Sequence, residues 1–429
     1  MKLFKLNLSL VFVSLSLSLS GQFTLTNLKN QIISMEEYDT QGWMIHLPSV
    51  SVALLSSGYT YGDLYTAETK TLSLQRAADQ NSDLNILANA RGSYGGIEMR
   101  KENWGLTVNH EWTADISVGV PDESVQFIVQ GNVNDDTRNT TISPSVTYQK
   151  MHRFSLGGYY AGHNGIIGAK LHYLNGVESL YTKELSIEVK AQEDFFALEF
   201  RKNINILSSG VLNYNSIEDI TYIGGNKVFT ASPITSNSGF GLSIYGKANL
   251  GDNLKVYGIV DDIGIIKWSR QAATYTDQSN SSFDGIDIRD AYFNDQEYSL
   301  KDTLYSLLSI DKDVAPFTST IGISLFTGLQ YAVSDRISIE ANYHGRAINS
   351  KLFSIVDLTG RYALTDGIVL ALSNKFAAKK LVNIGLGANF LIVRRLCVVL
   401  NTTNPWALRK YYDMNYGDFS IGMSYWLGD

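Results

Sequence analysis

Apolar and polar residues alternate strictly along much of the chain. In the clearest run, Ile384, Leu386, Ala388, Phe390 and Ile392 are separated mainly by glycine and asparagine. The same alternation recurs over residues 106–112, 167–174, 185–190, 242–250, 254–260, 337–344 and 419–425. Successive side chains of a β-strand point to opposite faces of its sheet. The pattern therefore predicts many strands, each with one apolar face.

Two all-β architectures produce this alternation. A soluble sandwich turns the apolar faces inward, whereas a barrel of the outer membrane turns them outward to lipid. Many of the segments reach about ten residues, which is the length of a tilted membrane-crossing strand. Aromatic residues also gather at the ends of the runs, as in the interfacial girdles of membrane barrels. We therefore predict a transmembrane β-barrel of about fourteen antiparallel strands, with the sandwich as the alternative.

Four segments depart from the alternation. Residues 22–46 precede the first convincing strand and are predicted to form an N-terminal lead or plug. Helical turns are plausible over residues 63–90. A second helix is predicted over residues 121–130, where a proline and two acidic residues stand at its start. Residues 277–313 are rich in aspartate and are predicted to form a long acidic loop insertion.

The beginning of the chain is typical of an export signal. Residues 1–21 combine two lysines, a serine-rich apolar stretch and small residues before Gln22. This order predicts a signal peptide that is cleaved before Gln22, leaving residues 22–429 as a single barrel domain. No later segment is long and apolar enough for a membrane-spanning helix. Together with the alternation, these features predict a location in the outer membrane.

Composition narrows the possible partners. Charged residues make up only 18% of the chain, and the net charge is −7. An acidic protein is poorly suited to nucleic acid, which needs a basic surface. The expected surroundings are outer-membrane lipid and lipopolysaccharide. Cys397 is the single cysteine, so an intrachain disulfide and a cysteine-based zinc site are both excluded.

The polar faces of the predicted strands identify candidate residues for the inside of the barrel. A barrel of about fourteen strands encloses a lumen that must be filled or that must let something pass. By strand alternation, the side chains predicted to face this lumen are Lys170, His172, Glu188, Lys190, Glu340 and Arg346.

The sequence contains none of the common catalytic motifs. A nucleophile elbow, a phosphate-binding loop and a paired-histidine zinc motif are all missing. A hydrolase in the barrel would require a serine or aspartate within reach of His172 or His344. We therefore predict that the protein is not an enzyme and has no cofactor or metal ion.

Several segments resemble a family of exported barrels from Bacteroidota that has no assigned function. The matching stretches are residues 130–132, 168–182, 256–268, 283–286 and 383–387. Within them, Asn175-Gly176 is typical of a tight turn, and Lys267-Trp268 of an interfacial anchor.

That family is distantly similar to long-chain fatty-acid transporter barrels and to the shuttle barrel of type IX secretion. The resemblance implies binding or passage of a small hydrophobic molecule. The alternative is a structural or accessory barrel that docks other envelope or secretion proteins.

Overall fold

The computed structural model describes the wall of the barrel and part of its connections. The described residues are 41–57, 65–66, 71–72, 83–130, 139–191, 198–214, 220–222, 236–283, 310–348, 351–365, 367–377, 380–392, 396–403 and 416–427. The predicted signal peptide and residues 22–40 lie outside them. Among the described residues, no helix is long and apolar enough to cross a membrane.

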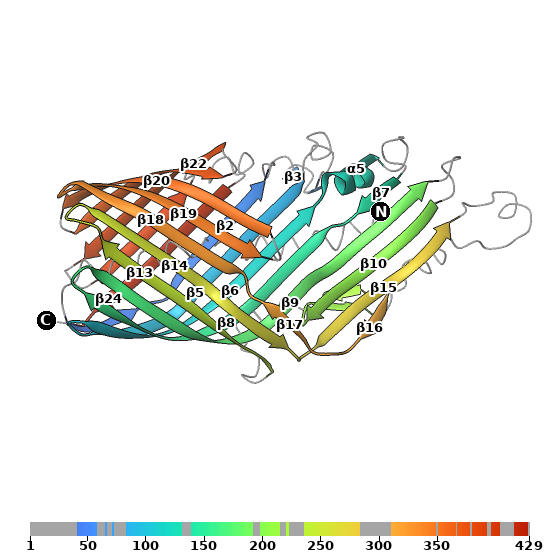
Figure 1. Ribbon diagram of the computed structural model, residues 1–429, viewed down its shortest axis with the longest axis horizontal. Helices are drawn as coiled ribbons and strands as arrows, with labels where there is room; N and C mark the ends of the chain where they lie inside the picture. Colours follow the sequence, from blue (N-terminus) through green and yellow to red (C-terminus); the bar gives the residue numbers. More distant parts are fainter. Residues whose placement is uncertain are drawn as a thin grey trace, which may run out of the picture.

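The wall is a closed antiparallel barrel of fourteen strands (Figure 1). β1 and β2 together make the first strand. Around the barrel follow β5, β6, β8, β9, β13, β14, β18, β19, β20, β21, β22, β23 and β24. β24 then pairs with β1 and β2 and closes the wall. The predicted fold and approximate strand number are confirmed.

The bounds of the wall strands are β1 Gly42–His46, β2 Ser49–Ser57, β5 Leu84–Arg100, β6 Trp104–Val120, β8 Ser145–Gly162, β9 Gly165–Ala191, β13 Asn237–Asn249, β14 Leu254–Trp268, β18 Ile323–Ser334, β19 Ile337–Ile348, β20 Lys351–Thr365, β21 Ile368–Ala377, β22 Lys380–Ile392, β23 Leu396–Thr403 and β24 Tyr416–Trp426. The other elements are β3 Tyr65–Thr66, β4 Thr71–Leu72, α5 Asp122–Gln130, β7 Asn139–Ile142, β10 Leu198–Ser209, β11 Leu212–Tyr214, β12 Ile220–Tyr222, β15 Ala272–Phe283, β16 Asp311–Asp313 and β17 Phe317–Thr320.

The distribution of side chains is the reverse of that in a soluble protein. Large apolar side chains stand on the outer face, where Leu171 is 65% exposed and Phe240 is 71% exposed. Charged side chains are buried inside, and Arg91, Glu98 and Asp261 are each at most 3% exposed. An outward apolar face and a polar interior are the arrangement of a membrane barrel, not of a sandwich.

The two ends of the barrel carry different connections. At the end where β24 finishes, on the left in Figure 1, two to four residues join neighbouring strands such as β5 and β6, β8 and β9, and β18 and β19. Longer connections, including the one that contains α5, lie at the opposite end. Bacterial membrane barrels have their short turns in the periplasm and their longer loops outside the cell.

Part of the sheet extends beyond the barrel at the end with the long connections. β9 is 27 residues long, and only its first part, residues 165–175, pairs with β13. Its second part pairs with β10, which pairs in turn with β15 and so leads to β16. We call β10, β15, β16 and the second part of β9 the projecting sheet, which lies on the right in Figure 1.

Two expected non-strand segments belong partly to the wall. Residues 42–46 form β1 and pair with β5 and β24, so the wall begins earlier than expected. Residues 84–90 are in β5 rather than in helical turns and pair with β6 along their whole length. Ile86, Ala88 and Ala90 lie on one face of the strand, and Asn85, Leu87 and Asn89 lie on the other.

The other two irregular segments are resolved differently. The predicted helix over residues 121–130 is confirmed as α5, with Asp122 and Glu123 in its first turn. The expected acidic loop is shorter than residues 277–313, because 277–283 continue β15 and 311–313 form β16. Its middle, residues 284–309, lies outside the described residues.

Asn175 and Gly176 are not in a turn, and Trp268 is not an interfacial anchor. Both residues of the dipeptide lie inside β9, and Trp268 is fully buried. A side chain at position 176 would overlap the indole ring of Trp268. The glycine is therefore needed for close packing, and the indole donates a hydrogen bond to Ser319 at 2.9 Å.

Candidate functional site

A β-bulge in β14 directs two successive carboxylates into the lumen. Opposite this point, Ser243 of β13 faces both Asp261 and Asp262, because the pairing register shifts between Leu242 and Ile244. Asp262 has a φ of 65°, a backbone conformation that is uncommon for residues other than glycine. The bulge breaks the alternation, so both aspartates are buried on the inside instead of only one.

Three arginines from other strands bind these carboxylates. Arg91 of β5 lies 2.9 Å from Asp261, and Arg153 of β8 lies 2.6 Å from Asp262. Arg346 of β19 is 3.4 Å from Asp262. Each arginine is at most 5% exposed, so water contributes little to the solvation of these charges. Buried charges are tolerated only when they are paired and hydrogen-bonded.

Two further acids complete the cluster. Glu111 of β6 accepts hydrogen bonds from both Arg91 and Arg153. Asp115 of β6 lies 2.6 Å from Arg346 and also accepts a hydrogen bond from Asn89. We call this set the ionic cluster; it consists of Arg91, Glu111, Asp115, Arg153, Asp261, Asp262 and Arg346.

A histidine connects the ionic cluster to the neighbouring strands. Ser155 lies 2.7 Å from Nδ1 of His172, and Ser243 lies 2.5 Å from Nε2 of the same ring. Ser243 also donates to Asp261. These bonds form a chain when Ser155 donates to Nδ1 and the Nε2 proton is donated to Ser243.

A serine is therefore within reach of His172, which is the distance requirement for a hydrolase. His344, the other histidine considered, lies 2.8 Å from Asp357. Ser155 is only 4% exposed and faces the filled lumen. A nucleophile needs room for substrate beside it, so burial favours a structural hydrogen-bond chain over catalysis.

The candidate lumen residues separate into two groups. Lys170, His172 and Arg346 are buried in or beside the ionic cluster, and Glu340 is buried against Arg361 at 2.7 Å. Glu188 and Lys190 lie in the second part of β9 and therefore in the projecting sheet. Among the described residues, no group of three potential ligands could hold a metal ion.

Most of the ionic cluster was not found from the sequence. Asp261 and Asp262 lie in a stretch that resembles the barrel family, but strict alternation allows only one of them to face inward. Arg91 and Arg153 lie in long strands, and the presence of arginine on a polar face was the available signal. Which distant strands meet inside a barrel cannot be inferred from alternation.

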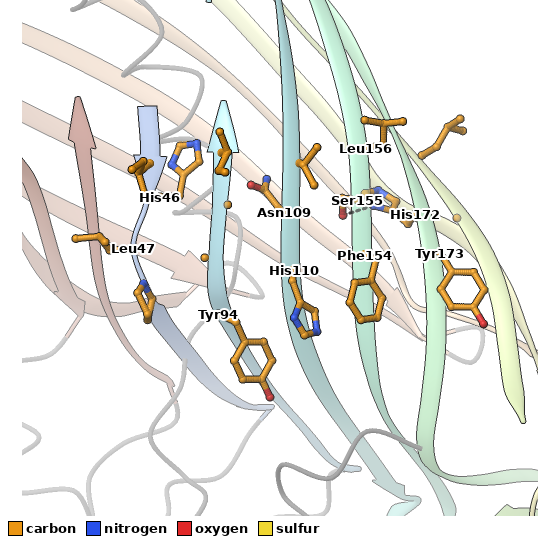
Figure 2. Close-up of a pocket in the computed structure, with 18 of the residues that line it drawn as sticks. His46, Leu47, Tyr94, Asn109, His110, Phe154, Ser155, Leu156, His172 and Tyr173 are labelled. Carbon is orange, nitrogen blue, oxygen red and sulfur yellow. Dashed lines mark hydrogen bonds between the residues drawn. The ribbon is translucent and has the colours of Figure 1, made fainter. Parts of the chain in front are cut away.

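A cavity of about 870 Å³ opens on the outer face of the wall (Figure 2). Outward apolar side chains line it, among them Val108, Leu156 and Leu171, which are 56%, 59% and 65% exposed. His172 and Ser155, on the neighbouring positions of the same strands, point to the other side. The cavity is therefore a feature of the lipid-facing surface, with the polar interior behind it.

A row of rings runs across this cavity from strand to strand. His110, Phe154, Tyr173 and Phe240 occupy directly paired positions on β6, β8, β9 and β13. The ring centroids of His110 and Phe154 are 4.1 Å apart, and Tyr94 stacks on His110 at 4.5 Å. Directly opposed aromatic residues stabilise neighbouring strands.

The wall is irregular where the cavity meets β1 and β5. β1 and β2 are separated by Leu47 and Pro48, and proline cannot donate to a ladder. In β5 the register shifts between Ser93 and Gly95, and Gly95 has a φ of 138°. A residue with a side chain rarely adopts that conformation, so the glycine permits the bulge.

The sequence of the chain settles its family. Residues 38–394 match the model of a family of unknown function, DUF5723. The chain belongs to DUF5723. No curated protein matches it.

The solved structures to which this DUF5723 protein is similar include two toluene transporters and a FadL homologue. The toluene transporter TbuX of Ralstonia pickettii has 6% identity and a TM-score of 0.38, over 90% of this chain and 88% of that one. The toluene transporter TodX of Pseudomonas putida has 9% identity and a TM-score of 0.35, with 91% and 89% covered. A FadL homologue of Pseudomonas aeruginosa has 10% identity and a TM-score of 0.36, with 90% of each chain covered. The likeness is one of fold.

Proposed function

We propose that this protein is an outer-membrane barrel that binds a small hydrophobic molecule in the wall cavity and catalyses no reaction on it. The observation that carries this proposal is the 870 Å³ cavity with its apolar lining. Small-molecule sites typically have volumes of about 300–1,000 Å³ and predominantly apolar walls. The cavity opens on the lipid-facing side, so an apolar molecule reaches it from the bilayer without crossing water.

The proposal places the mature protein in the outer membrane, among lipid and lipopolysaccharide. In this proposal residues 1–21 direct export as a signal peptide and are then removed by cleavage before Gln22. The apolar outer face supports this location, because it would be costly to expose to water. N-terminal sequencing of the protein isolated from membranes should begin at Gln22, and an intact N-terminus would contradict the cleavage.

Filling the cavity should weaken binding. The probe is N-phenyl-1-naphthylamine, whose fluorescence rises in apolar surroundings, titrated into the protein in lipid nanodiscs. Val108→Trp and Leu171→Trp each place a large ring in the cavity, and we expect at least about tenfold weaker binding, or about 1.4 kcal/mol.

Leu325→Trp is the matched control for these two variants. Leu325 is also an outward-facing residue, 41% exposed, on β18, and it does not line the cavity. Probe affinity should be unchanged in this variant. Equal affinities for all three variants and the unaltered protein would contradict binding in the cavity.

The projecting sheet favours a second function, the docking of another envelope or type IX secretion protein. It stands beyond the barrel, and opposite charges face each other across its strands at Glu188 and Arg201 and at Lys190 and Glu199. If it is a docking surface, the charge reversal Arg201→Glu should release a partner that is cross-linked to the unaltered barrel. If the Arg201→Glu variant and the unaltered barrel retain the partner equally, the result would count against docking at this surface.

A further inference from the structure

Two contacts join opposite walls directly across the lumen. Arg346 of β19 lies 2.6 Å from Asp115 of β6, and these strands are six places apart around the barrel. Lys351 of β20 lies 3.0 Å from Asn85 of β5, and these strands are also six places apart. The two contacts use different residues on four different strands.

Such contacts are incompatible with a round barrel. With strands about 4.8 Å apart and tilted by about 40°, a round barrel of fourteen strands is about 28 Å wide, and strands six places apart are about 27 Å from each other. An extended arginine, an aspartate and the bond between them span roughly 14 Å from backbone to backbone. The cross-section must therefore be flattened where β6 faces β19.

The charges of the ionic cluster balance when the neighbouring Lys170 is counted with it. Its three arginines face four carboxylates, and Lys170 is buried beside it. With the lysine included, four positive charges stand against four negative ones. A balanced cluster leaves little field to attract a passing ion, whereas pairs between opposite walls hold those walls together.

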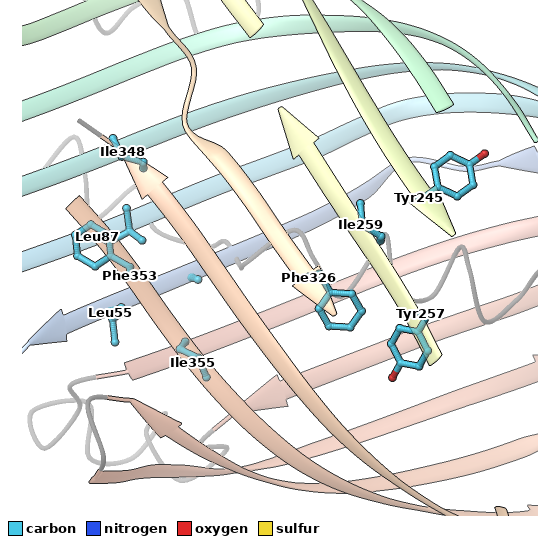
Figure 3. Packing of buried hydrophobic residues seen from close by; sticks show 10 residues of the cluster. Leu55, Leu87, Tyr245, Tyr257, Ile259, Phe326, Ile348, Phe353 and Ile355 are labelled. Atoms are coloured by element: carbon cyan, nitrogen blue, oxygen red, sulfur yellow. The ribbon is translucent and has the colours of Figure 1, made fainter. Parts of the chain in front are cut away.

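An apolar layer joins the same walls toward the end with the long connections (Figure 3). Leu55 of β2 and Leu87 of β5 belong to one buried cluster with Ile348, Phe353 and Ile355 of β19 and β20. Phe353 and Leu87 are both buried, at 8% and 0% exposure. Side chains of the wall itself therefore fill this part of the lumen.

We propose that the ionic cluster is a strut that holds the barrel flat and closes the lumen between β6 and β19. The bulge turns Asp262 into the lumen beside Asp261. The two carboxylates together bind Arg91 and Arg153 from one wall and Arg346 from the opposite wall. The strut does not depend on what the wall cavity binds. A molecule in that cavity does not continue straight through this part of the lumen.

The first test measures the shape of the unaltered wall with pairs of nitroxide labels in a Cys397→Ser background. One pair, Ala114→Cys and Ala347→Cys, lies on the outer face beside the strut, on β6 and β19. The other, Ile244→Cys and Leu386→Cys, joins β13 and β22, which are also six places apart. The first distance should be shorter by at least about 10 Å. Equal distances would overturn the proposal.

The second test removes the contact of the strut between β6 and β19 and leaves the total charge unchanged. In the variant Asp115→Ala with Arg346→Ala, the distance between the labels on β6 and β19 should lengthen and its distribution should broaden. The control, Glu340→Ala with Arg361→Ala, removes an ion pair between the adjacent strands β19 and β20 and should leave that distance unchanged.

Ion conductance in planar bilayers gives a second readout of the same variants. Loss of the strut should raise conductance above that of the unaltered protein, and the control should not. A folded strut variant with unchanged distance and conductance would overturn the proposal. If the strut variant does not fold, the comparison of the two label pairs in the unaltered wall still tests whether the barrel is flattened.

Discussion

The two sides of the lumen differ although the same alternation builds both. On the side from β5 to β20, the inward positions carry arginines, aspartates and large apolar residues that reach the opposite wall. On β21 to β24 most inward positions are small or short and polar, and several of them remain half-buried: Ala371, Ser373, Asn389, Asn401, Gly422 and Ser424. The larger inward groups on these strands include the ion pair between Lys375 and Asp418, which joins strands three places apart, and the buried Trp426. Strand period thus specifies which face is inward, while side-chain size determines whether that face is filled.

The outward faces of the two sides are alike. Leu325 and Ile339 on the filled side and Leu372 and Leu386 on the small-residue side are all more than 40% exposed. The outer face contacts lipid around the whole circumference, and any apolar side chain is suitable at such a position. Only the lumen distinguishes the sides, and substitutions at lumen positions should therefore distinguish them too.

The largest difference is expected for deletion of a buried charge. Arg153→Ala leaves Glu111, Asp261 and Asp262 short of a partner, which should cost about 3–5 kcal/mol of unfolding free energy. Asn401→Ala on the other side removes one hydrogen bond to Ser420 and should cost about 0.5–1.5 kcal/mol. Urea titration of the folded band on unboiled gels measures both, and similar midpoints would contradict the contrast.

A smaller difference is expected for added methyl groups. Gly176→Ala forces a carbon against the buried ring of Trp268, which has no room to move, and should cost about 1–3 kcal/mol. The corresponding contact of Gly387→Ala is with the amide of Asn401, a side chain that can turn away. We expect less than about 1 kcal/mol there. Thermal unfolding of the two variants in the same detergent compares them directly, and a larger loss at position 387 would reverse the account.

The smallest difference is expected for the removal of single hydroxyl groups. Ser243→Ala removes the link between His172 and Asp261 and should cost about 1–2 kcal/mol. Ser373→Ala, at a half-buried position of β21, should stay within about 0.5 kcal/mol. Equal losses of urea resistance would show that both positions are packed alike.

The sequence was sufficient for the wall but not for its interior. Alternation predicted the strands because lipid outside and polar groups inside impose the same period throughout. Alternation could not show that Lys170 faces the lumen whereas Lys190 lies in the projecting sheet. The reason is that β9 keeps the same alternation in both of its parts. Alternation also concealed Asp262, whose inward direction depends on a bulge, and the meeting of Arg346 with Asp115, which depends on the flattened cross-section.

The central claim is that the apolar faces of these strands point outward into the outer membrane. Membrane fractionation combined with gel migration before and after boiling tests it most directly. The account predicts that the mature protein is found in the outer-membrane fraction and that its mobility changes on boiling, as a stable barrel unfolds. A protein found in the soluble fraction, with the same mobility before and after boiling, would contradict it.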